Sequence, residues 1–102
     1  MMFVTGGPMT ESLCLPRRLD SAAALQLVPA LLPLRNRPLR IDASEVEVMG
    51  ALAFEVLLSA ARQWADDGHV LTLSRPSDPV RAAARSLGLE RSMPWSEEPE
   101  SA

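Results

Sequence analysis

The sequence contains no lysine and no tyrosine, and it has one cysteine and one histidine. The single Cys14 excludes an intramolecular disulfide framework and a cysteine-cluster metal site. One histidine likewise provides no His-rich zinc site, so we expect no metal and no cofactor. Basic residues are scarce as well: 10 arginines face 13 acidic residues, which gives a net charge of −3. A general nucleic-acid binder needs an excess of positive charge, so we expect no nucleic-acid partner.

Long hydrophobic runs are also absent. The run from Ala51 to Leu58 is interrupted by Glu55 and is far shorter than the roughly 20 residues that cross a bilayer. The amino terminus has neither a basic segment nor an apolar core of a signal peptide. With 47% hydrophobic and 23% charged residues over 102 positions, the chain can bury a core of its own. These features predict one domain in the cytoplasm, without membrane insertion.

Hydrophobic patterning predicts strands and helices in alternation. Strands are expected at 12–15, 39–41 and 69–73, and residues 2–4 suit either an edge strand or a frayed end. Asp20 suits the N-cap of a helix that is kinked or restarted at Pro29, and Asp78 followed by Pro79 suits the start of the last helix. This order predicts an α/β fold in which helices pack on a small, mixed or mostly parallel sheet.

The clearest helix is expected from Gly50 to Asp66. Its polar positions form one stripe and its apolar positions the opposite one; the polar stripe is Glu55, Ser59, Arg62 and Asp66, and the apolar stripe is Ala53, Leu57, Ala60 and Trp64. We expect an N-terminal segment at 1–10, the domain at 11–91 and an acidic flexible tail at 92–102. Within this tail, Trp95 suits either a docking anchor or a contact with its own domain.

The segment Leu39-Arg40-Ile41-Asp42-Ala43-Ser44-Glu45-Val46-Glu47-Val48-Met49-Gly50-Ala51-Leu52 resembles the signature of the STAS domain family. This family comprises bacterial anti-sigma-factor antagonists and related interaction modules. Asp42 matches its strand-ending aspartate, and Val46 and Val48-Met49 match its hydrophobic positions. The resemblance covers roughly residues 11–91 and implies a STAS-like fold. The chain is especially similar to short STAS proteins of chemotaxis operons, some of which bind the chemotaxis sensor kinase.

One position departs from the family pattern. Members that are switched by phosphorylation carry an aspartate followed by the acceptor serine at the start of the long helix. Gly50 and Ala51 occupy these two positions here. Ala51 has no hydroxyl, so the resemblance implies a module without the usual phosphoserine switch. Ser44 is the nearest alternative acceptor, and we expect it to make a local hydrogen bond instead.

The resemblance implies a partner-binding surface on the loop and the start of the long helix: Ser44, Glu45, Glu47, Met49, Gly50, Ala51, Phe54 and Leu58. The implied partner is a histidine kinase or kinase-like ATPase in bacterial chemotaxis or sigma-factor regulation. The alternative is a cytoplasmic STAS regulatory subunit of a lipid-transport ABC system. The oligomeric state is left open.

Catalytic chemistry has little support in the sequence. Asp42, Glu45 and Glu47 suit a solvated acidic rim, while His69 suits a structural or exposed position and Cys14 a buried one. No Gly-rich phosphate loop and no nucleophile elbow is present. We therefore expect no catalytic residues and a protein that is not an enzyme.

Overall fold

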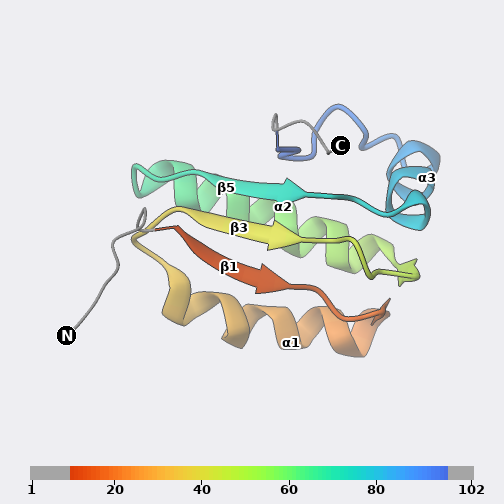
Figure 1. Ribbon diagram of the computed structural model, residues 1–102, viewed down its shortest axis with the longest axis horizontal. Coiled ribbons are helices and arrows are strands. Elements are labelled where there is room, and N and C mark those ends of the chain that lie inside the picture. The colour runs from red at the N-terminus through yellow and green to blue at the C-terminus, as the bar shows by residue number, and fades with distance from the viewer. Residues whose placement is uncertain (1–9, 97–102) are drawn as a thin grey trace.

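The computed structural model describes residues 10–96 and contains a three-stranded parallel sheet (Figure 1). The strands are β1 (Glu11–Cys14), β3 (Leu39–Asp42) and β5 (Leu71–Ser74), in the order β1-β3-β5. Leu13, Ile41 and Leu73 lie in register across the sheet. The α/β prediction with a small, mostly parallel sheet is confirmed. The N-terminal strand considered at 2–4 lies outside the described residues.

Two helices connect these strands and pack against one another. They are α1 (Ser21–Leu31), which runs alongside β1, and α2 (Ala51–Asp66), which lies behind β3 and β5 in Figure 1. Successive parallel connections are right-handed, so both helices cover the same face of the sheet. Alternate strand residues point to that face and are buried: Leu39, Ile41, Leu71 and Leu73. On the other face, Ser12, Cys14 and Arg40 are exposed.

Helix α1 begins where the sequence predicts it. The Asp20 carboxylate accepts a hydrogen bond from the Ala23 N–H at 3.0 Å. The helix continues through Pro29 and changes at Leu32 into the 3-10 helix η1 (Leu32–Leu34). The restart predicted at Pro29 is therefore not found, and the helical geometry changes only after Leu31.

Helix α2 has the predicted stripes. Its apolar residues Ala53, Leu57, Ala60 and Trp64 are buried, whereas the four polar positions are exposed. The Trp64 indole N–H donates to the Arg37 carbonyl at 2.9 Å. Gly68, at φ +84°, ends the helix, and the His69 N–H returns to the Trp64 carbonyl at 2.9 Å. Glycine accepts this left-handed conformation without steric cost.

Helix α3 (Asp78–Ser86) starts one residue earlier than predicted. Ser77, not Asp78, is the N-cap, and its hydroxyl accepts from the Val80 N–H at 3.4 Å. Asp78 instead occupies the first turn, where a carboxylate is favourable near the positive end of the helix dipole.

Two further strands escape prediction because each has only two residues. They are β2 (Arg18–Leu19) and β4 (Val48–Met49), which pair in parallel as a separate ribbon. A pair of residues is too short to show alternation, and its partner lies some thirty positions away.

Two predictions are wrong. Cys14 is exposed, because it occupies the strand position that points away from the helices. The flexible tail does not begin at residue 92: Met93 is buried, and Leu73 pairs with Trp95 through Leu73 N–H to Pro94 O at 2.7 Å and Ser96 N–H to Leu73 O at 2.9 Å. Of the two alternatives for Trp95, the structure shows contact with its own domain.

No helix within residues 10–96 is both long and apolar enough to span a membrane.

Candidate functional site

The loop between β3 and α2 lies at the carboxyl end of the parallel strands, beside α3 (Figure 1). Ser77 fixes one side of this loop. Its hydroxyl donates to the Val46 carbonyl at 2.6 Å, and its N–H donates to the Ala43 carbonyl at 3.2 Å. Ala43 and Val46 are buried, so the loop is anchored by its small and aliphatic side chains. Glu45 between them, and Glu47 and Val48 after them, are exposed to solvent.

The β2 segment fixes the other side of the loop. The Arg17 carbonyl accepts from the N–H groups of Glu47 at 2.7 Å and Val48 at 3.0 Å. The Gly50 N–H then donates to the Leu19 carbonyl at 3.0 Å. The loop is thus hydrogen-bonded to two different elements, and its exposed side chains have defined positions.

Asp42 organises the start of the loop. Its carboxylate accepts from the Ser44 N–H at 2.8 Å and lies 3.9 Å from the Arg75 guanidinium. Partial burial raises the pKa of Asp42, but the hydrogen bonds from the Ser44 hydroxyl and N–H, together with Arg75 and Arg40, outweigh it. The net result is a pKa below the ordinary value of 3.8. Asp42 is therefore a structural carboxylate, and the Ser44 hydroxyl is bonded locally to it.

The predicted partner-binding residues divide by exposure. Glu45, Glu47 and Ala51 are exposed, while Ser44, Gly50 and Leu58 are half-buried. Met49 and Phe54 are buried in the core, with Phe54 fully inaccessible. Phe54 faces the sheet with Ala53 and Leu57, because the apolar arc of α2 is wider than a single stripe. The expectation that Met49 and Phe54 offer surface anchors is wrong for this structure.

The N-terminus of α2 presents no reactive group. Gly50 is the N-cap, no side chain caps the helix, and its first turn contains no acidic residue. Ala51 is the first helical residue, and it is exposed. Within residues 10–96, no cluster of three or more His, Cys, Asp or Glu side chains is arranged to hold a metal.

A model of the family described as "Mlab, STAS domain" matches residues 11–94. The chain belongs to the STAS domain family. The comparison with curated proteins gives no match. STAS domains are in general regulatory protein-interaction modules without an enzymatic activity. The matched segment extends past residue 91, in agreement with the packing of Met93 against the STAS core.

Sequence reasoning missed Ser77 and Arg17 as supports of the STAS loop. The sequence Ser77-Asp78-Pro79 does signal a helix start, but both of its first two residues suit an N-cap. The Val46 carbonyl, brought to 2.6 Å of the serine hydroxyl by the fold, decides between them. Arg17 acts through its carbonyl, and no side-chain pattern reports such a role.

Proposed function

We propose that this STAS protein regulates a histidine-kinase-type ATPase by binding it through the 43–50 loop and the exposed first residue of α2. The observation that carries the proposal is the arrangement of this loop. It is hydrogen-bonded on both sides, and its exposed side chains are the carboxylates of Glu45 and Glu47 and the neighbouring Val48, which is 40% exposed. A preorganised loop loses little conformational entropy on binding, and exposed carboxylates can select a basic partner surface.

In this proposal, binding of the STAS protein is coupled to the conformational equilibrium of the kinase. Phosphorylation of Ala51 is chemically impossible, and the Ser44 hydroxyl is already hydrogen-bonded to Asp42. The module is therefore constitutively able to bind, and the partner is the regulated component. Binding changes the kinase output by stabilising one of its conformations. The protein itself performs no chemistry.

An affinity capture from native cytoplasm tests the surface. The wild type is compared with Glu45→Arg/Glu47→Arg and with the matched control Asp66→Arg/Glu90→Arg. The control makes the same change in net charge at exposed positions outside the loop. We expect a histidine-kinase-type ATPase to be recovered by the wild type and the control, and lost from the loop variant. Recovery of an ABC-transport ATPase supports the alternative, a STAS subunit of a lipid-transport system. Equal recovery by all three proteins contradicts the proposed surface.

A phosphorylation assay tests the constitutive mode. The captured kinase is incubated with radiolabelled ATP in the presence and absence of the protein. We expect the rate of kinase autophosphorylation to change on addition of the wild type, while the STAS protein remains unlabelled. Label on Ser44 would contradict constitutive binding, and an unchanged rate with every variant would contradict a regulatory role.

A further inference from the structure

Arg75 has an unfavourable backbone conformation in the loop between β5 and α3. Its φ is +53°, in the left-handed region that side chains other than glycine seldom adopt. The next residue is Pro76, and a residue before proline favours an extended conformation with negative φ. Arginine also lacks the short polar side chain with which asparagine and aspartate support a left-handed backbone. Glycine would adopt this conformation at a lower cost in free energy.

The side chain of Arg75 does little to compensate for this cost. It is 68% exposed, and its guanidinium lies 3.9 Å from the Asp42 carboxylate, which is beyond hydrogen-bond distance. Asp42 does not depend on this arginine, because its carboxylate accepts a hydrogen bond from the Ser44 N–H at 2.8 Å. An exposed ion pair of this kind adds little to stability. The domain therefore has an arginine at a position where its own stability favours glycine.

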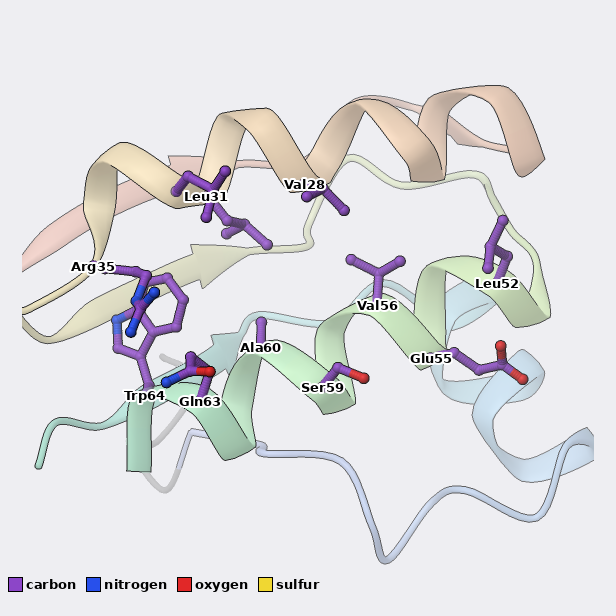
Figure 2. A pocket seen from close by; sticks show the side chains of 11 residues that line it. Val28, Leu31, Arg35, Leu52, Glu55, Val56, Ser59, Ala60, Gln63 and Trp64 are labelled. Carbon is purple, nitrogen blue, oxygen red and sulfur yellow. The ribbon is translucent and has the colours of Figure 1, made fainter. Parts of the chain in front are cut away.

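Arg35 shows how an arginine with a structural role is held in this protein. It lines one end of a groove of about 480 Å³ between α1 and α2, as Trp64 does (Figure 2). Its guanidinium donates two hydrogen bonds of 3.1 Å to the Asp67 carboxylate, and its side chain is 37% exposed. Arg75 donates no such bonds within residues 10–96 and is much more exposed. Its charge can therefore pair with a group from outside the domain.

The backbone on both sides of Arg75 is bound to the 43–50 loop. The Ala43 N–H donates to the Ser74 carbonyl at 2.9 Å, and the Ser77 N–H donates to the Ala43 carbonyl at 3.2 Å. Arg75 is thus fixed at the carboxyl end of the sheet, next to the first residues of this loop (Figure 1). Its guanidinium belongs to the same end of the molecule as the exposed carboxylates of the loop.

We infer that Arg75 is a partner-binding residue of this surface and that the partner places a carboxylate opposite its guanidinium. The role assigned to Arg75 rests on the proposed function, and it adds an acidic site to the basic partner surface that Glu45 and Glu47 select. Strained backbone positions persist where the surrounding structure holds them, and they cluster at functional sites. A guanidinium can bind a carboxylate through two parallel N–H···O bonds. Charges of both signs on one surface also define the orientation of the partner.

Arg75→Gly separates binding from folding. It removes the guanidinium and the unfavourable backbone conformation together, so we expect the urea midpoint to rise by roughly 0.3 M while binding weakens. Asn36→Gly is the matched control, since Asn36 has a φ of +71° and precedes β3 at the opposite end of the sheet. It should not lower the midpoint, and it should leave binding unchanged. An Arg75→Gly midpoint equal to or below that of the wild type would overturn the inference without any partner.

The charge is tested by Arg75→Gln, with the dissociation constant measured by calorimetry for the purified ATPase that the wild type captures. We expect both Arg75 variants to raise the Kd about tenfold. Arg62→Gln removes the same charge from an exposed position in the second half of α2 and should change the Kd less than about twofold. A Kd within twofold of the wild type for both Arg75 variants overturns the inference and leaves the proposed function intact. Capture of no ATPase by the wild type contradicts the proposed function itself, and the role of Arg75 falls with it.

Discussion

Removing the hydroxyl of Ser77 should release the β3–α2 loop and lower the stability of the whole domain. In Ser77→Ala, the Val46 carbonyl loses its 2.6 Å donor, and the α3 N-terminus loses its capping oxygen. The long 3.4 Å cap contributes at the low end of its usual range, about 0.5 kcal/mol. The bond to Val46, whose residue is 1% exposed, contributes more, because the carbonyl is left without a partner in a buried place. That loss costs about 1–3 kcal/mol.

Together these losses give a decrease of about 2 kcal/mol in the free energy of unfolding. This is a sizeable part of the roughly 5–15 kcal/mol that a domain of this size has in total. Urea denaturation followed by circular dichroism should show a midpoint lower by about 1 M with an unchanged slope. Amide hydrogen exchange should accelerate in the 44–48 segment, where the loop loses its attachment to α3.

Ser86→Ala is the matched control, since it removes an exposed serine hydroxyl from the last residue of the same helix. We expect it to change stability by no more than about 0.5 kcal/mol. If Ser77→Ala lowers the urea midpoint no more than Ser86→Ala does, the hydroxyl does not anchor the loop, and the reasoning is refuted.

Three further predictions concern single residues. Phe54→Ala should cost about 3–5 kcal/mol of stability because the ring is fully buried, whereas the exposed Leu25→Ala should have little effect in thermal unfolding; a stable Phe54→Ala variant that loses its partner would contradict the core position. The pKa of Asp42 is lowered in the folded state, so its contribution to stability is complete above the unfolded value near 3.8 and is lost as pH falls through the lower folded value. Asp42→Asn should therefore flatten the stability profile below about pH 4, and an identical acid limb would argue against this. The Cys14 thiol should react with a disulfide reagent equally fast in native and urea-unfolded protein, and protection in the native state would be inconsistent with its exposure.

The STAS signature determined the placement of the loop but not which of its side chains face outward. Glu45 and Glu47 are exposed, as polar loop residues usually are, whereas Met49 and Phe54 are buried in the core. Whether a hydrophobic residue near a helix start reaches solvent depends on which elements cover that helix. The covering elements here are the sheet and α1, and how they pack on α2 is decided by the tertiary structure.

The local sequence alone was sufficient to predict the three main strands and several of the helix ends. The alternating apolar pattern placed β1, β3 and β5, the carboxylate of Asp20 began α1, and Gly68 ended α2, because each depends on neighbours within a few residues. Tertiary structure alone decided what depends on residues brought together from a distance. The two-residue ribbon of β2 and β4, the choice of Ser77 as the cap of α3, and the packing of Met93 and Trp95 on β5 all rest on such contacts. The groove between α1 and α2 also depends on such contacts. The sequence predicts that the first helix is apolar, but not which of its sides α2 covers.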